Sequence, residues 1–274
     1  MRLRIRVLPR YRVPRGLSFA VLVASIAAGL AAVGIVFAAG GVNPFYALGK
    51  IFAGSFGSRY GLGETVTKAI PLILIGSGLA LVFRGKFWNI GAEGQLLAGA
   101  CAATWIGLNV HLPGILLIPL MFASGFVAGA AWGTLLAVLK GRFGVNEVIS
   151  SLMLNYIAYE LITLLITGPW KGKTQQGFPY TDDFSAAASL WQIPTTRIHV
   201  VTLALALAAA VALLFLLRST RFGYELRVMG ENPEAARYAG INFIGITAVA
   251  MAVSGGVAGM AGVGEVAAID HHLS

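Results

Sequence analysis

The chain is divided into long apolar blocks, and this pattern limits what it can fold into more than any other feature. Each block has roughly 20 residues, the length that a helix needs to cross a hydrocarbon layer of about 30 Å. A helix satisfies its own backbone hydrogen bonds, as a membrane interior requires. Only 11% of the 274 residues are charged, against about 25% in soluble domains. The sequence therefore predicts an all-α, polytopic bundle of transmembrane helices.

The apolar blocks predict seven spans. Between them, segment 43–63 carries five glycines and segment 170–197 is polar and aromatic, so we expect both to be loops. The chain then consists of a basic N-terminal segment, 1–16, and one membrane domain, 17–274. The predicted spans are 17–39, 64–83, 90–110, 112–139, 145–167, 200–217 and 243–264.

The basic residues are distributed unevenly between the predicted loops. With the N-terminus placed inside, 14 of the 20 Lys and Arg residues lie on the cytoplasmic side, in the N-terminal segment and around 84–86, 140–142 and 218–237. This is the bias expected of cytoplasmic loops. It also accounts for the net charge of +9, because no separate basic domain is present that would bind nucleic acid.

The first block shares some features with a cleaved signal peptide, since arginines precede it and small residues end it at Phe37-Ala38-Ala39. Its apolar run of about 23 residues is longer than the roughly 7 to 15 residues of a signal sequence. We therefore expect a retained first span.

Few side chains are suited to catalysis or metal binding. Cys101 is the only cysteine, which excludes an intrachain disulfide and a thiolate metal site. The four histidines, His111, His199, His271 and His272, have no second ligand at helical spacing. We expect no enzymatic activity and no bound metal or cofactor in this chain.

A short segment, Gly172-Lys173-Thr174, resembles the end of a phosphate-binding loop. That loop needs a glycine, four further residues and then Gly-Lys-Ser/Thr. Here the preceding glycine is Gly168, one residue too close. The chain is therefore expected not to bind ATP, and any dependence on ATP has to come from a partner.

Glycines recur at every fourth position in two spans. They are Gly125, Gly129 and Gly133 in one, and Gly255 and Gly259 in the other. Small residues at this spacing allow helix backbones to approach closely in lipid. We interpret them as packing positions within the bundle.

The cytoplasmic segment 218–241 contains the signals of a short helix. Asn232 is a suitable N-cap, Pro233 fits the first helical position and Glu234 is favoured near the positive end of the helix dipole. Gly240 is suited to ending the turn. We predict a helix of fewer than ten residues between Asn232 and Gly240.

The predicted helix carries three small residues, Ala235, Ala236 and Ala239. They would form a shallow surface that a groove on a partner protein could accept. The alternative is a helical elbow that only joins two spans. Composition does not distinguish these two interpretations.

The fifth predicted span contains a polar stripe, which consists of Glu147, Ser151, Asn155 and Tyr159. Their spacing places them on one helical face. Polar groups at membrane depth usually face a cavity or another helix. Two hypotheses stay open: a substrate-lining surface and an interhelical hydrogen-bond seam.

A second polar motif begins the third predicted span. Asn89 is suited to capping this helix, and Glu93 favours its N-terminal end. A structural role is therefore expected more than contact with substrate. The motif residues are Asn89, Gly91, Glu93, Gly94 and Gln95.

Three segments, 83–95, 144–158 and 223–241, resemble permease subunits of ATP-binding-cassette importers in the simple-sugar and nucleoside branch. The nucleoside type is most similar, and the resemblance covers residues 64–270. It implies two permease subunits, identical or different, in a bacterial or archaeal cell membrane. It also implies ATP-hydrolysing subunits on the cytoplasmic side and an extracytoplasmic substrate-binding protein. The family pattern usually continues past Ser274, so we expect a truncated permease domain.

The resemblance further implies that segment 218–242 is a coupling loop that contacts the ATP-hydrolysing subunit. The candidate coupling residues are Gly223, Glu225, Arg227, Gly230, Glu231, Asn232, Pro233, Ala235, Ala236 and Gly240.

Several functions stay open. The importer's substrate is expected to be a nucleoside, with a simple sugar as the alternative. A secondary transporter working alone would need ion-coupling carboxylates near the bilayer midplane, where Glu160 is the main acidic residue. A membrane scaffold without a pathway is a third alternative, disfavoured by the polar stripe.

Overall fold

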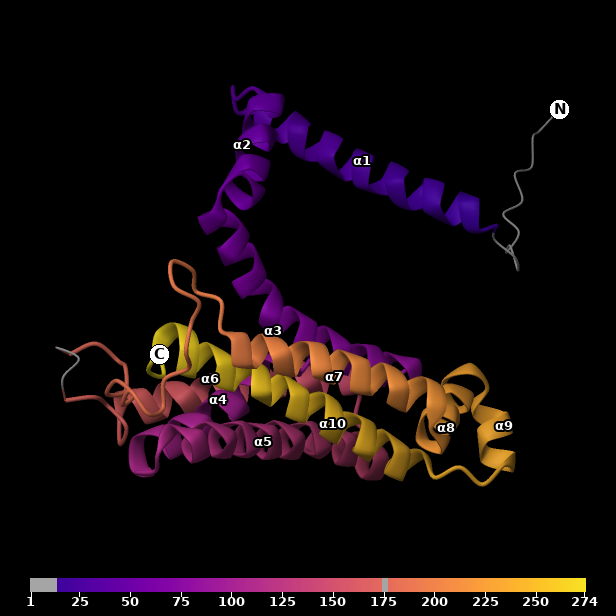
Figure 1. Cartoon of the computed structure of the whole chain (residues 1–274). Helices are drawn as coiled ribbons and strands as arrows, with labels where there is room; N and C mark the ends of the chain where they lie inside the picture. Colours follow the sequence, from indigo (N-terminus) through magenta and orange to yellow (C-terminus); the bar gives the residue numbers. More distant parts are fainter. Residues whose placement is uncertain (1–13, 174–176) are drawn as a thin grey trace. The chain divides into compact units, whose positions relative to one another are not determined.

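The computed structural model describes residues 14–173 and 177–274, and the secondary-structure elements within these residues are helices, apart from one isolated bridge (Figure 1). Most of the predicted N-terminal segment 1–16, and Thr174, lie outside the described residues. The helices are α1 (Arg15–Ala39), α2 (Pro44–Phe56), α3 (Arg59–Arg84), α4 (Ala92–Asn109), α5 (Gly114–Phe143), α6 (Glu147–Thr167), α7 (Val200–Ser219), α8 (Arg221–Glu231), α9 (Pro233–Tyr238), α10 (Phe243–Gly264) and the π-helix η1 (Glu265–Asp270).

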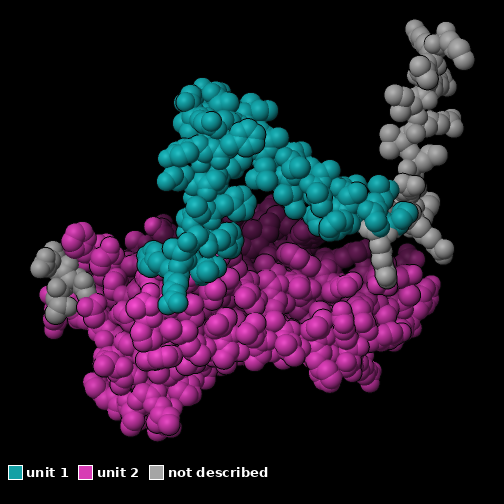
Figure 2. Space-filling model, turned by 45° about the horizontal axis from the view of Figure 1, so that its top comes forward, with its two compact units in different colours: residues 1–62 teal, residues 63–274 magenta. Residues whose placement is uncertain are grey.

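The chain divides into two compact units, residues 1–62 and 63–274 (Figure 2). The first contains α1, α2 and the beginning of α3. Its helix α2 was not predicted, because five glycines made segment 43–63 read as a loop. Asn43 caps α2 by accepting hydrogen bonds from the backbone N–H groups of Phe45 and Tyr46, at 3.0 and 3.2 Å. Pro44 occupies the first helical position, where its missing N–H costs nothing.

The second unit is built around α4, α5 and α10, which pack against one another along their lengths. The glycines predicted to mediate packing lie at these contacts. A methyl group at Gly129 would overlap the carbonyl oxygen of Gly255, and one at Gly259 would overlap that of Gly125. Gly99 on α4 likewise lies against the backbone of Gly259. The interpretation of these glycines as packing positions is confirmed.

Each of the seven predicted spans corresponds to a helix, and the chain is a multi-pass membrane protein. Among the described residues, six helices are long and apolar enough to cross a membrane. The seventh, α4, is shorter and has 18 residues. Gln95 and Thr104 are almost completely buried in the protein. Because these two polar side chains face the protein, α4 needs less apolarity than a lipid-facing span.

The basic segments around 84–86, 140–142 and 218–237 gather at one end of the second unit. There α3, α5 and α7 finish, α10 begins, and α8 and α9 lie, whereas the segment after α6 and the C-terminus lie at the opposite end (Figure 1). Lys86, Lys140 and Arg221 thus share the end that the basic bias makes cytoplasmic.

We expect substitution of Gly129 by alanine to destabilise the second unit by about 1 to 3 kcal/mol, because overpacking of a close contact has this cost. Gly76 on α3 is the matched control, since a methyl group there meets nothing within 4 Å. The measurement is the apparent melting temperature of the purified protein in detergent. Equal melting temperatures for Gly129→Ala and Gly76→Ala would contradict the close approach of α5 and α10.

Candidate functional site

The segment between α7 and α10 folds into two short helices. Helix α8 begins where the Thr220 hydroxyl oxygen accepts a hydrogen bond from the Gly223 N–H at 3.1 Å. An ion pair of 2.7 Å joins Arg221 to Glu225 one turn later. Leu226 is buried, so α8 is amphipathic and packs on the bundle. Helix α8 was not predicted.

Helix α9 confirms the short helix predicted between Asn232 and Gly240. The Asn232 side chain accepts a hydrogen bond from the Ala235 N–H at 3.0 Å, and Pro233 is the first helical residue. Gly240 follows with a φ of +71°, the left-handed conformation that glycine adopts without a steric penalty.

The alanines of α9 are not all exposed, although the predicted small-residue surface requires this. Ala236 is fully buried within the hydrophobic core of the chain itself, so the prediction that it forms part of an exposed surface is wrong. A short helix that packs on a bundle buries one side, and Ala236 lies on the buried side of α9. Ala235 and Ala239 are exposed. Tyr238 beside them is 94% exposed, and sequence reasoning overlooked it.

Two candidate coupling glycines fix α8 to the ends of other helices. A methyl group at Gly230 would overlap the Arg84 carbonyl oxygen at the end of α3, and one at Gly223 would overlap backbone atoms at Leu217 of α7. Displacement of α8 would therefore be resisted by α3 and α7 directly. The other candidates are half-buried or exposed: Glu225 and Arg227 are half-buried, and Glu231, Asn232 and Pro233 are exposed.

The polar stripe on α6 separates into buried and exposed members. The Asn155 side chain accepts a hydrogen bond from the Gly94 N–H at 2.8 Å and donates one to the Ile90 carbonyl at 3.1 Å. The Ser151 hydroxyl accepts one from the Ile90 N–H at 3.3 Å. These two residues form an interhelical seam between α6 and the beginning of α4.

The remaining stripe residues lie outside this seam. Glu147 makes an ion pair of 2.6 Å with Lys140, which ties the beginning of α6 to the end of α5. Tyr159 is 59% exposed. It is the most exposed member of the stripe.

The motif before α4 serves the same seam. Gly91, and not Asn89, is the N-cap of α4, so the capping role predicted for Asn89 is wrong. The Asn89 side chain instead accepts a hydrogen bond from the Gly91 N–H at 2.9 Å and pairs with the Gln95 side chain. Asn89 and Gln95 are both nearly completely buried, and Glu93 is exposed in the first helical turn.

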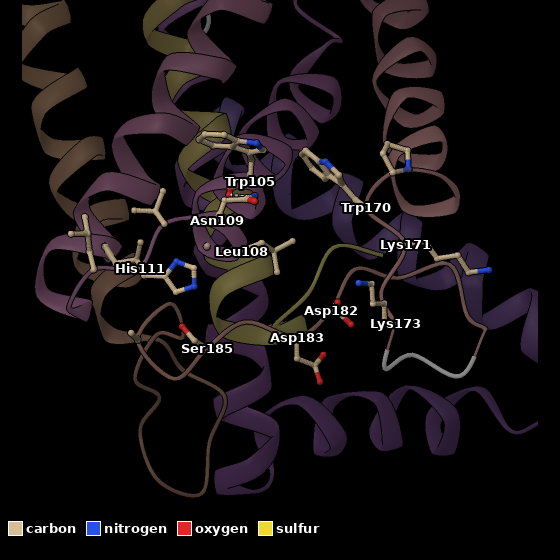
Figure 3. A pocket seen from close by; sticks show the side chains of 16 residues that line it. Trp105, Leu108, Asn109, His111, Trp170, Lys171, Lys173, Asp182, Asp183 and Ser185 are labelled. Atoms are coloured by element: carbon tan, nitrogen blue, oxygen red, sulfur yellow. Dashed lines mark hydrogen bonds between the residues drawn. The ribbon is translucent and has the colours of Figure 1, made fainter.

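A cavity of about 860 Å³ lies at the opposite end of the second unit. Figure 3 shows Trp105 and Asn109 from α4 and Trp170 after α6 around it, with Asp182 and Lys173 from the following segment. Its size is that of a small-molecule pocket. Sequence reasoning missed it because its residues come from helix ends distant in sequence.

His199 is buried beside this end, at the N-terminus of α7. Its side chain is 1% exposed, and neither ring nitrogen has a hydrogen-bond partner among the described residues. Burial lowers the pKa of His199 to about 4, because it disfavours the charged imidazolium. No group of three or more metal-ligating side chains occurs in residues 14–173 and 177–274.

The chain is similar to transport proteins of known families. Residues 61–273 match the model of the family described as the permease component of branched-chain amino acid transport systems. A glucose ABC transporter permease of Haloferax volcanii is 39% identical over 96% of this chain and 73% of its own length. A guanosine ABC transporter permease of Bacillus subtilis is 34% identical over 88% and 70%. A nucleoside ABC transporter permease of Lactococcus lactis is 32% identical over 84% and 65%. No solved structure gives a significant match.

Substituting Asn155 by leucine should destabilise the protein by about 1 to 3 kcal/mol, because the Gly94 N–H and the Ile90 carbonyl lose their partner in a buried place. Substituting Leu164, which is 64% exposed on the same helix, by alanine is the control and should have little effect. Thermal unfolding in detergent is the measurement. Wild-type stability of Asn155→Leu would show that the seam does not hold α4 to α6.

Stability should also fall as the pH is lowered from about 6.5 to 4. The ordinary histidine pKa is near 6.5, and in the folded chain the pKa of His199 is about 4. The unfolded state therefore binds more protons in this window, and His199 contributes a loss of up to about 3 kcal/mol. Comparing melting temperatures of wild type and His199→Gln across this window tests it. A variant with the same pH dependence as wild type would exclude His199 as the cause.

Proposed function

Because the chain belongs to the family of branched-chain amino acid transport system permease components, we propose that it is the permease subunit of an ATP-driven importer that translocates nucleosides. The observation that carries this proposal is the cytoplasmic helix α9, with an exposed tyrosine and small residues on its outer side and a firm attachment to the bundle behind it. A scaffold without a transport role would not require this arrangement.

The nucleoside substrate is supported by the names of two relatives, a guanosine and a nucleoside transporter permease. The glucose transporter permease has the higher identity and supports a simple sugar as the second candidate. ATP-dependent uptake of labelled guanosine and labelled glucose, measured in membrane vesicles containing the whole transporter, distinguishes the two. Uptake of neither substrate would argue against both.

The partners are proposed from the family and from the two ends of the second unit. A separate subunit would hydrolyse ATP on the side of α8 and α9, and this chain would hold no nucleotide or other cofactor. A second permease subunit, identical or different, would complete the pore. A substrate-binding protein would dock at the opposite end, where the segment after α6 and its cavity lie.

Coupling would run through the backbone contacts of α8. A partner that displaces α9 also displaces α8, to which α9 is joined at Asn232. Gly230 and Gly223 place α8 directly on the ends of α3 and α7, so that the movement reaches both spans without side-chain rearrangement. Of the polar stripe, Tyr159 is proposed to contact substrate, while Ser151 and Asn155 keep α6 in place.

The docking role of α9 is tested by substituting Tyr238. Tyr238→Ala removes the exposed ring and keeps a strong helix former, so the chain should insert normally. Tyrosines at interface hot spots contribute about 2 kcal/mol or more, which corresponds to at least a thirtyfold loss of affinity. We expect poor copurification with the ATP-binding subunit and reduced uptake.

Tyr238→Phe is the matched control, because it keeps the ring and should retain the partner. If Tyr238→Ala copurifies and transports as wild type does, the segment is an elbow between two spans and α9 is not the docking element.

A further inference from the structure

A second cavity, of about 450 Å³, lies at the cytoplasmic end of the second unit. Its walls are the turn between α3 and α4, the end of α5, helix α9 and the beginning of α10. It is separate from the seam and from the proposed docking side of α9. Nothing in the proposed transport cycle requires it.

The cavity is lined by three cationic side chains, Lys86, Lys140 and Arg237, and its described lining contains no carboxylate. Lys140 is neutralised in part by its ion pair of 2.6 Å with Glu147. Lys86 and Arg237 make no ion pair with a described residue. The cavity therefore has an excess of positive charge from three different segments of the chain.

Lys86 has an unusual backbone conformation. Its φ is +54°, a left-handed conformation that is uncommon in residues other than glycine. The preceding residue, Gly85, packs against the side chains of Leu226 and Met229 of α8. The turn that carries Lys86 is therefore in contact with α8 at the edge of the cavity.

Apart from Thr247, the rest of the lining is apolar, and most of it lies at the ends of membrane spans. Phe87 is buried, and Lys140 Nζ lies 4.7 Å from the centre of its ring. Ile244 at the beginning of α10 is 48% exposed. Cationic groups above an apolar wall, at the cytoplasmic end of spans, are the surroundings of a lipid headgroup with its acyl chains beside it.

We propose that this cavity binds the phosphate group of an anionic lipid from the cytoplasmic leaflet. Lys86 and Arg237 would contact the phosphate oxygens, Thr247 is a further hydroxyl of the lining, and the acyl chains would lie along the exposed side of α10. Bound lipid would connect α9 to the ends of α5 and α10, and so would stiffen the segment on which a partner acts.

An acidic segment of a partner protein fits the cavity less well. Pro233 and Arg237 line it from α9, whereas Tyr238, the proposed docking residue, is outside the lining. A partner that docks through Tyr238 would therefore not need to enter the cavity. Soluble phosphate shares the same chemistry but makes no use of the apolar wall.

The test uses the full chain in membranes of phosphatidylcholine that contain spin-labelled phosphatidylglycerol or spin-labelled phosphatidylcholine. The fraction of immobilised label gives the relative affinity of the protein for the two lipids. We expect phosphatidylglycerol to be preferred, and Lys86→Asn to lower its affinity about fivefold, since one basic residue near the surface contributes about this factor. Asparagine tolerates the left-handed conformation, so this variant should remain folded.

Arg142→Gln is the control, because Arg142 is exposed at the same end, outside the lining, and should leave the preference unchanged. An equal loss in both variants would show a diffuse charge effect and overturn the proposal. Displacement of the labelled lipid by inorganic phosphate alone would assign the site to a soluble anion. Unchanged lipid preference in Lys86→Asn, together with lost copurification of the ATP-binding subunit, would assign it to the partner.

Discussion

The close approach of α5 to α10 is the constraint on which the rest of the second unit depends. Gly129 and Gly133 of α5 lie directly against backbone atoms of α10, and Gly125 lies against both the Gly259 backbone and the Val263 side chain. In lipid, helix association relies on van der Waals contact and weak interhelical hydrogen bonds. Lipid tails are as apolar as the helix surfaces, so they provide no hydrophobic driving force for association. Two helices in such close contact have little freedom to slide past each other. The pair of α5 and α10 therefore provides a fixed axis for the surrounding helices.

Helix α4 completes this core and explains why polar residues are tolerated within it. Gly99 and Gly262 bring α4 against α10, and Asn155 joins its first turn to α6. Ser151, Asn155 and Asn89 each bond a backbone group at the beginning of α4. The seam is therefore a consequence of placing a helix terminus, with its free N–H groups, inside the bundle.

Much of this architecture follows from the sequence because apolar length, basic bias and small-residue spacing are local signals. The cap at Asn232 and the proline after it were sufficient to place α9. The sequence alone did not indicate which side chains face the core. Ala236 and Ala235 are adjacent and chemically identical, yet one is in the core and the other is exposed, because only the contact of α8 and α9 with the bundle decides which side faces inward. Asn89 has the chemistry of an N-cap, but the seam with Gln95 uses its side chain instead. The cavity around Trp105 and Trp170 depends on helix ends that are separated by more than sixty residues.

The two sides of α9 carry different chemistry, and this has a mechanical implication. A helix of six residues makes few contacts. If a partner acted only on its exposed side, such a helix would rotate. Ala236 in the core prevents rotation on one side. Arg237, beside the Phe243 ring at 5.8 Å from its guanidinium carbon to the ring centre, connects the other edge to the beginning of α10. Ala236 and Arg237 thus hold α9 at two places, and Gly230 of the preceding helix α8 lies against the end of α3. Displacement of α9 would act on the beginning of α10 directly and on the end of α3 through α8, which is the property that the proposed coupling element requires.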